Sequence, residues 1–452
     1  MNAIDELTRL MFEPDPFADD GRGDLADVRL AAANERLEEQ RGSVRALDAR
    51  AGEVGVDRIE SRADLVPLLF AHSVYKSYPE SFLAQNRWKE MSTWLDTVTY
   101  GDVRAVEVSG CSDVDEWLDR PDEGGFHTVV SSGTSGKNSF LIMDDVDLDM
   151  ILRLQVHLFA YPFLIEPRND RPVTIMAPGL ARMRIGYSYR AYGKCFARPG
   201  AIHSLSDEPV RVGDTLRAVS MRRAMADGTA KPSEIAAFEA ETAARNERVA
   251  SDLRTMMERI LSYRGEPQII SGQWAMAWRL MEFAHAAGIP DGSFHPDTTV
   301  SIAGGLKGLT LPADYQDQMN RFLGPVRRPK IYSMSEQSVA APMCEHGLYH
   351  WPKALELFIL DESGEHIVPL DASGRVTGRV GFFDPLWHGR WGGVVTGDKV
   401  TASYAPCPCG RLGPTIEDSV VRYSELSTGG DDKLTCGGTI EEYIRGVVTQ
   451  PL

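Results

Sequence analysis

The chain has 452 residues, of which 65 are Asp or Glu and 48 are Lys or Arg, giving a formal net charge of −17. So acidic a chain lacks the basic surface that nucleic acid requires, which argues against DNA or RNA as a main partner. No apolar run approaches the ~20 residues of a membrane span, and the first residues show no signal-peptide pattern. Six cysteines in so long a chain do not suggest a disulfide scaffold, so we expect a cytoplasmic protein.

Residues 1–100 are expected to form a mostly helical N-terminal cap. The stretch 24–52 is rich in Ala, Leu, Arg and Glu, with apolar residues at helical spacing. We interpret it as a solvated cap. Trp88, Trp94 and Tyr100 are expected to pack on the main domain. No motif in this region indicates a chemical function.

A loop rich in glycine and hydroxyl groups follows the short apolar run at 127–130. The loop, Ser131-Ser132-Gly133-Thr134-Ser135-Gly136-Lys137, offers backbone N–H groups, hydroxyls and one cation, as a polyphosphate site requires. It is not a P-loop, because Ser131 stands where that motif has glycine and Asn138 stands where it has Ser or Thr. The plain alternative is an ordinary Gly/Ser turn.

Strands predicted at 172–178, 268–272 and 300–305 alternate with helices. This alternation predicts an α/β sheet whose ligand site lies beyond the carboxyl ends of the strands, and the loops of the predicted motifs all lie at such ends. Residues 207–264 are rich in Arg, Ala, Glu and Met and are expected to form two or three inserted helices beside the substrate pocket.

Two later segments also place polar side chains after apolar runs. In Ile331-Tyr332-Ser333-Met334-Ser335-Glu336, an aromatic residue, hydroxyls and an acid follow a strand end. In Val394-Val395-Thr396-Gly397-Asp398, an apolar strand is expected to turn at Gly397 into a carboxylate.

Taken in this order, the three motifs resemble those of the adenylate-forming enzymes. The resemblance implies that the first motif is a flexible phosphate loop, that Tyr332 stacks on adenine, that Glu336 holds magnesium and that Asp398 bonds the ribose hydroxyls. Plain alternatives are a core tyrosine, a surface acid and a turn-forming aspartate. The implied nucleotide-binding residues are Ser131, Ser132, Gly133, Thr134, Ser135, Gly136, Lys137, Gly304, Gly305, Tyr332, Ser333, Met334, Ser335, Asp398, and Arg411 or Arg422, of which Arg422 matches the family better.

Three segments narrow the resemblance to the branch of the phenylacetate–CoA ligases and the acyl-protein synthetases of bacterial luminescence operons. They are CEHGLYH at 344–350, WGGVVTGDK at 391–399 and CPCGR at 407–411. Residues 430–439 look closest to the acyl-protein synthetases. The resemblance implies a large adenylation core at 101–421 and a hinge near 422–433. The mobile C-terminal domain of relatives would then be absent or truncated to a stub at 422–452.

Four residues are predicted to act in catalysis: Lys137, Glu336, Cys436 and Lys307. By resemblance, Cys436 occupies the place of the cysteine that takes the acyl group in acyl-protein synthetases, which would split the reaction into two easier steps. The alternative is a small buried residue in a glycine-rich turn. Lys307 could partly replace the swinging lysine of the missing domain, or simply face solvent.

A second constellation predicts a metal site. Cys344, His350, Cys407 and Cys409 offer three thiolates and an imidazole, a set that suits tetrahedral zinc. Four protein ligands would leave no open position, so the site would be structural. His346 is the rival to His350, and free buried thiols are the alternative to a metal.

The sequence therefore predicts an ATP- and magnesium-dependent enzyme that adenylates a carboxylic acid, releases pyrophosphate and passes the acyl group to a thiol of Cys436, CoA or a carrier protein. An acyl reductase partner is an expectation by resemblance. Alternatives are adenylation of another oxyacid such as nitrite, amide formation, and a non-catalytic nucleotide-binding protein. The identity of the acid stays open, as do a homodimeric state and whether Arg182, Arg184 and Arg190 face the substrate.

Overall fold

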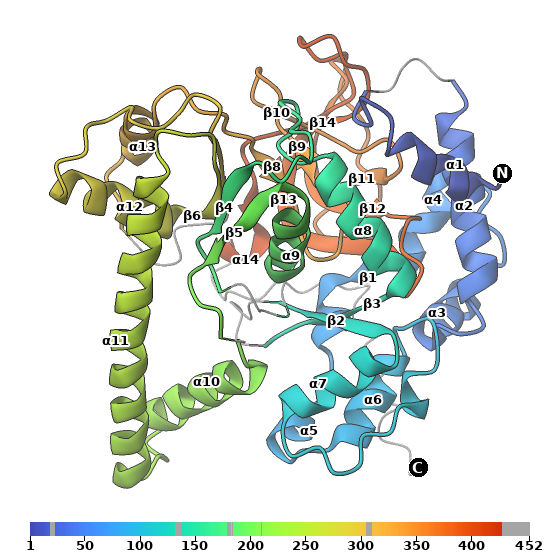
Figure 1. Ribbon diagram of the computed structural model, residues 1–452. Coiled ribbons are helices and arrows are strands. Elements are labelled where there is room, and N and C mark those ends of the chain that lie inside the picture. The colour runs from blue at the N-terminus through green and yellow to red at the C-terminus, as the bar shows by residue number, and fades with distance from the viewer. Residues whose placement is uncertain are drawn as a thin grey trace. The chain divides into compact units, whose positions relative to one another are not determined.

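The computed structural model describes residues 1–18, 23–131, 137–178, 182, 184–208, 210–303 and 310–426. The chain divides into two compact units (Figure 1). The first combines Met1–Leu154 with Ile331–Leu452, and the second is the continuous stretch Gln155–Lys330. Both contain helices and strands, which confirms the predicted mixed α/β class. The predicted C-terminal stub after residue 426 lies outside the described residues.

The described part of the first unit is organised around a seven-stranded sheet in the order β10-β14-β13-β12-β11, with β1 and β15 also pairing with β13. All pairings are antiparallel except that of β1 with β13. Side chains of β13 alternate between buried and half-buried from Thr396 onward, as expected for a strand with one covered face. The strands are β1 Phe70–Ala71, β10 Leu348–His350, β11 Glu356–Leu360, β12 Arg375–Phe383, β13 Gly393–Ser403, β14 Thr415–Glu417 and β15 Val421–Arg422.

The N-terminal part of the first unit is helical, as predicted, but it is not merely a solvated cap. In α2, Arg36 and Gln40 are buried along with Leu37. Trp88 stacks on Trp117 with ring centroids 6.0 Å apart, so aromatic packing joins the helices α6 and α7. The helices are α1 Ala3–Leu10, α2 Leu25–Gln40, α3 Arg45–Val54, α4 Arg62–Leu65, α5 Glu80–Ala84, α6 Trp88–Asp96, α7 Val114–Glu123 and α14 Tyr423–Leu426, with 3₁₀ turns at Val66–Leu68, His72–Lys76 and Val103–Ala105.

The strands that carry the first two predicted motifs form separate antiparallel pairs, and the third motif lies on β13 of the seven-stranded sheet. β2 (Phe126–Val130) pairs with β3 (Phe140–Asp144), and β8 (Ile331–Tyr332) pairs with β9 (Ala341–Pro342). The loops after β2 and β8 follow strand ends, as expected, but these strands pair apart from the sheet β5-β4-β6-β7. The predicted turn at Gly397 is absent, because β13 continues through Asp398 to Ser403.

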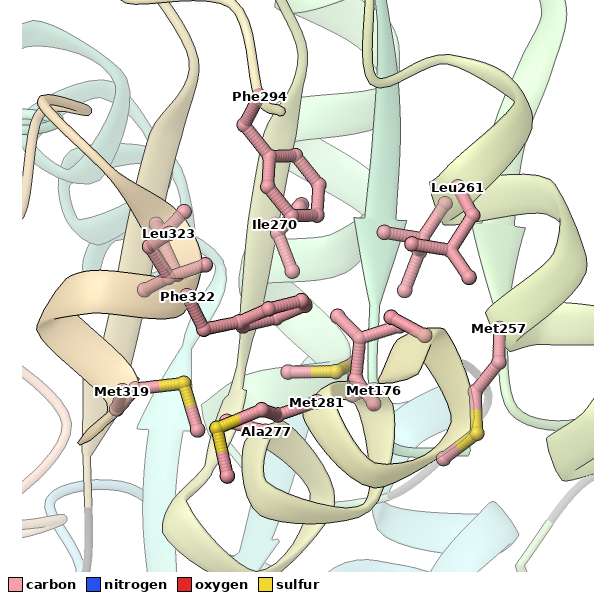
Figure 2. Packing of buried hydrophobic residues seen from close by; sticks show 14 of the residues in the cluster. Met176, Met257, Leu261, Ile270, Ala277, Met281, Phe294, Met319, Phe322 and Leu323 are labelled. Carbon is pink, nitrogen blue, oxygen red and sulfur yellow. The ribbon is translucent and has the colours of Figure 1, made fainter. Parts of the chain in front are cut away.

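The second unit contains a parallel sheet in the order β5-β4-β6-β7. Three of its strands match the predicted ones, and β5 was missed. A cluster of methionine, leucine and phenylalanine side chains fills the space between β6, α11, α12 and α13, where Phe294 meets Phe322 edge to face (Figure 2). The elements are β4 Arg171–Ile175, α9 Arg184–Phe196, β5 Ala197–Ser204, α10 Val212–Ala226, α11 Pro232–Ser262, β6 Ile269–Gln273, α12 Trp274–Ala286, β7 Thr299–Ala303 and α13 Tyr315–Leu323. Helix α8 (Asp145–His157) runs across the boundary between the units.

Helices α10 and α11 form the predicted helical insertion (Figure 1). Pro232 begins α11 and the Glu234 carboxylate accepts from the Lys231 backbone N–H at 3.0 Å, both ordinary features of a helix start. Only the last third of α11 is buried, at Leu253, Met256, Met257, Ile260 and Leu261. This spacing of three and four residues anchors one end of the helix in the core.

Candidate functional site

Asp398 lies where three segments of the first unit meet. It sits on β13, opposite Arg422 of β15 in the ladder. The Tyr332 hydroxyl donates to Asp398 Oδ2 at 2.9 Å, and Arg422 Nε lies 3.3 Å from Oδ1. Asp398 is almost covered, with 9% of its side chain exposed, whereas Arg422 is 60% exposed. The carboxylate is therefore held in a fixed orientation between a neutral donor and a cation.

Tyr332 is buried and neutral. Burial and the neighbouring Asp398 carboxylate raise the pKa of its hydroxyl well above the ordinary value, so the hydroxyl keeps its proton and acts as a donor. Its ring lies 6.0 Å from that of Tyr349, centroid to centroid. The structure thus gives Tyr332 a contact that the sequence did not predict, the orientation of Asp398.

Glu336 belongs to the same charged group. Burial raises the pKa of its carboxyl group, while the positive charges of Arg390 and Arg422 act in the opposite direction and Asp398 adds to the rise. Among the described residues no side chain donates a hydrogen bond to the Glu336 carboxylate. The backbone carbonyl of Glu336 accepts from Trp387 Nε1 at 2.8 Å. Of the residues between Tyr332 and Glu336, Ser333 is exposed, and Met334 and Ser335 are half-buried.

The described ends of the predicted phosphate loop lie against Tyr78. Lys137 Nζ donates to the Tyr78 carbonyl and lies 4.2 Å from the centre of its ring, an arrangement that favours a cation. At the other end, Ser131 Oγ accepts from the Ser139 backbone N–H at 2.8 Å, and Asn138 Nδ2 donates to the Ser131 carbonyl at 2.6 Å. The loop is thus closed at its base.

Several predicted site residues lie outside the described residues. They are Ser132, Gly133, Thr134, Ser135, Gly136, Gly304, Gly305, Lys307 and Cys436. Of the three arginines near the predicted substrate segment, Arg184 begins α9, Arg182 is half-buried, and Arg190 is exposed with its guanidinium 4.5 Å from the ring centre of Tyr187.

The four predicted zinc ligands come together in the first unit. The ligand atoms of Cys344, His350, Cys407 and Cys409 all lie within 4.8 Å of one another. The Cys344 and Cys407 sulfurs are 3.8 Å apart, and the Cys409 sulfur is 3.4 Å from His350 Nε2. His346, the rival ligand, is exposed and is not in the group.

The spacing and protonation of this cluster fit a tetrahedral metal. Two thiolates at about 2.3 Å from a tetrahedral zinc lie about 3.8 Å from each other, the separation found for Cys344 and Cys407. Burial, helped by the charge of Arg411, lowers the pKa of His350 to about 4, so the imidazole is neutral as a ligand must be. Burial raises the pKa of Cys407 to about 12, so this thiol stays protonated until a bound cation displaces the proton.

Arg411 lies at this cluster. Its Nη1 is 3.5 Å from the Cys409 sulfur, and its Nε donates to Asp15 Oδ2 at 2.8 Å. Arg422, in contrast, pairs with Asp398. Of the two arginines predicted to compete for a ribose or phosphate contact, the structure therefore places Arg422 at the predicted ribose carboxylate.

No family model matches this chain, and no curated protein matches its sequence. Among solved structures it is similar to a 2-hydroxyisobutyryl-CoA ligase in complex with 2-HIB-AMP and CoA, at 12% identity and a TM-score of 0.49 over 94% of this chain and 85% of that one. It is also similar to an acyl-CoA synthetase (AMP-forming)/AMP-acid ligase II-like protein from Dyadobacter fermentans, at 9% identity and a TM-score of 0.33 over 70% of this chain and 66% of that one. None of the helices within the described ranges has the length and apolarity to span a membrane.

Proposed function

We propose that this chain is an ATP- and magnesium-dependent enzyme that converts a carboxylic acid into its acyl-adenylate and releases pyrophosphate. The observation that carries the proposal is the meeting of Tyr332, Asp398, Glu336 and Arg422 from separate segments of the first unit. These are the residues that the resemblance to adenylate-forming enzymes assigns to adenine, ribose and magnesium.

Asp398 is suited to bind the ribose. A carboxylate has about four acceptor positions, and Tyr332 and Arg422 use two of them, which leaves positions for two hydroxyl donors. Arg422 is exposed enough to meet a phosphate as well as Asp398. A fixed carboxylate beside an exposed cation therefore matches a nucleoside phosphate.

Glu336 is suited to hold the metal, because its carboxylate offers the hard oxygen ligand that Mg²⁺ prefers and lies in the same charged group as Asp398. Magnesium, when bound, would neutralise the charge that develops on the phosphoryl oxygens. In the reaction an oxygen of the acid attacks the α-phosphorus, the bond to pyrophosphate breaks, and the acid leaves as a mixed anhydride with AMP. Lys137 is proposed to exchange its Tyr78 carbonyl partner for a phosphate oxygen.

We further propose transfer of the acyl group from AMP to a thiol, with Cys436 as the acceptor in this chain and CoA or a carrier as external acceptors. The thiolate attacks the acyl carbon and AMP leaves with the bonding electrons. Replacing Cys436 with Ser should spare adenylation and abolish self-acylation. A stable acyl group on the Ser variant would show that the acceptor is elsewhere.

Release of pyrophosphate and AMP from magnesium-ATP tests the adenylation step. The panel contains fatty, aromatic, amino-aryl and dicarboxylic acids, with nitrite plus an aryl amine as a separate arm. Turnover with one carboxylate class supports the proposal and identifies the substrate. A signal from nitrite alone would retain the nucleotide site but overturn acyl transfer, and nucleotide binding without turnover in any arm would favour a non-catalytic protein.

The cluster of Cys344, His350, Cys407 and Cys409 is proposed to bind one structural zinc ion, because its spacing and its neutral imidazole fit that metal. Four protein ligands leave no open position, so the metal would supply stability and no reactive group. It would tie the segment that follows Glu336 to the segment that follows Asp398. Metal analysis of protein never exposed to chelator should find about one zinc per chain, and finding none would overturn the proposal.

A further inference from the structure

The backbone of Glu336 is held by a loop that no motif identified. We propose that Asp384–Arg390, here called the clamp loop, positions Glu336 for its metal, with Arg390 and Trp387 as the positioning residues. The inference rests on the proposed role of Glu336 as magnesium ligand. It concerns residues of the first unit alone.

Two buried donors of the clamp loop meet at one oxygen. The Glu336 carbonyl accepts from Trp387 Nε1 at 2.8 Å and from Arg390 Nη2 at 3.0 Å. Arg390 and Trp387 are only 1% and 2% exposed. Since a carbonyl oxygen has two lone pairs, both are used, and the peptide after Glu336 is fixed. The carboxylate side chain extends from a backbone that cannot easily rotate.

The Arg390 guanidinium has more N–H donors than its hydrogen bonds among the described residues use. Its guanidinium lies 3.8 Å from the ring centre of Trp387 and 5.5 Å from that of Tyr75. Its Nε and Nη1 have no hydrogen-bond partner among the described residues. A buried cation with unused donors is unfavourable unless neighbouring groups stabilise its charge, and the nearby acids do so.

The positive charge of Arg390 acts on the Glu336 carboxyl group. Among the effects on the Glu336 carboxyl, burial raises the pKa most, and the positive charge of Arg390 is the strongest influence in the opposite direction. The field of Arg390 also reaches Asp384 and Asp147, so its charge is shared among three acids. Arg390 therefore acts on Glu336 through its hydrogen bond to the carbonyl and through a positive charge held nearby.

The clamp loop is itself immobilised from behind. Gln40 of α2 donates to the His388 carbonyl at 2.8 Å, and Arg36 of the same helix donates to the Pro385 carbonyl at 2.8 Å. On the other side, the Asp147 carboxylate accepts from the backbone N–H groups of His388 and Gly389 at 2.7 and 2.8 Å. Because these contacts fix the loop on both sides of Trp387 and Arg390, the two donors reach Glu336 from a rigid support.

The test compares Arg390→Met, Trp387→Phe and Arg390→Lys with the wild-type chain. Calorimetry measures ATP binding with saturating magnesium and in EDTA, and activity measurements give the magnesium concentration for half-maximal pyrophosphate release. Loss of a group that orients a metal ligand costs 10- to 100-fold in metal affinity. We therefore expect Arg390→Met to raise the magnesium requirement by about tenfold without changing ATP binding in EDTA. Trp387→Phe, which keeps the ring but loses one donor, should raise the requirement by a smaller factor, and Arg390→Lys should restore part of the loss.

Arg50→Met is the matched control, because Arg50 also donates to a carbonyl, that of Pro67, at 2.8 Å, and pairs with Glu53. An unchanged magnesium requirement in Arg390→Met, with only a lower melting temperature, would overturn the positioning role. If Arg390→Met does not fold, Trp387→Phe and Arg390→Lys decide the question. A third outcome separates the two proposals. If the wild-type chain turns over no acid but binds ATP in a magnesium-dependent way, and the variants bind it more weakly, the clamp is supported and the proposed reaction is refuted. Wild-type ATP binding that does not depend on magnesium would overturn both.

Discussion

The two acids of the site are held in opposite ways. Asp398 lies within a long strand and is fixed through its carboxylate, by Tyr332 and Arg422. Glu336 lies on a loop and is fixed through its backbone carbonyl, by Trp387 and Arg390. The first arrangement suits recognition of hydroxyl groups at a fixed position. The second leaves the carboxylate oxygens of Glu336 available, as the proposed magnesium site requires.

Replacing Glu336 with Gln should give the largest loss. The amide keeps the size of the side chain but removes its charge, and a metal in such a site supplies several kcal/mol of transition-state stabilisation. We expect the rate of pyrophosphate release to fall at least about 100-fold. Glu365→Gln, on an exposed turn, is the control and should retain wild-type activity. Equal activity of the two variants would contradict the role of Glu336.

Removing one of the proposed zinc ligands should affect the segments that follow both acids. Cys407→Ser is expected to lower the free energy of unfolding by at least about 2 kcal/mol, because metal binding contributes directly to folding. Thermal melts with and without chelator provide the measurement: the chelator should destabilise the wild-type chain but not the variant. Cys111→Ser replaces a thiol outside the cluster and should behave like the wild type. A wild-type melting curve insensitive to chelator would count against a structural metal.

The Asp398 support is tested by comparing Asp398→Asn with Tyr332→Phe. The asparagine loses the charge that pairs with Arg422, and a hydrogen bond to a charged group contributes about 1.5–3 kcal/mol. We therefore expect the KM for ATP to rise about tenfold in Asp398→Asn. Tyr332→Phe removes only a neutral donor, so a rise of about threefold is expected. Initial rates at varied ATP measure both, and a larger effect in Tyr332→Phe would show that Tyr332 contacts the nucleotide directly.

The smallest expected effect is a pH dependence of the unfolding free energy, and it comes from His388 of the clamp loop. The Asp144 carboxylate accepts from His388 Nδ1 and raises the pKa of that histidine. The stabilisation is complete below the unfolded value of about 6.5 and is lost as the pH rises through the higher folded pKa. The unfolding free energy should therefore exceed that of His388→Gln by up to about 1 kcal/mol at pH 6, and by less at pH 8. Urea titrations across this range measure the difference, and a constant difference would refute the charged pair.

The sequence predicted best those features that depend on local pattern. The strands β4, β6 and β7 are short segments rich in Val and Ile, and the thiols and imidazole at 344–409 have the residue types and order of a zinc site. The strand β5 was missed because its sequence, ARPGAIHS, contains proline and glycine, which ordinarily mark a turn. The glycine before Asp398 was read as a turn for the same reason, although Val400 and Ala402 continue the alternation of β13.

Contacts between distant segments could not be predicted in the same way. Arg390 stands in the stretch HGRWGG, which has the composition of an exposed loop, yet its side chain is buried beside Trp387. Nothing in local periodicity indicates that α2 would hold this loop. The pairing of Arg411 with the cysteine cluster also depends on Asp15, almost four hundred positions earlier. Such long-range contacts are decided by the tertiary packing alone.

The support of the clamp loop also sets an order of events in the growing chain. Arg36 and Gln40 bond to carbonyls that lie 349 and 348 residues further along, with the whole second unit between them. At 5–20 residues per second, synthesis of that span takes roughly 20 to 70 seconds. The continuous second unit is synthesised within this interval, whereas α2 gains its contacts with the clamp loop only afterwards. The backbone support of Glu336 is therefore completed late in synthesis.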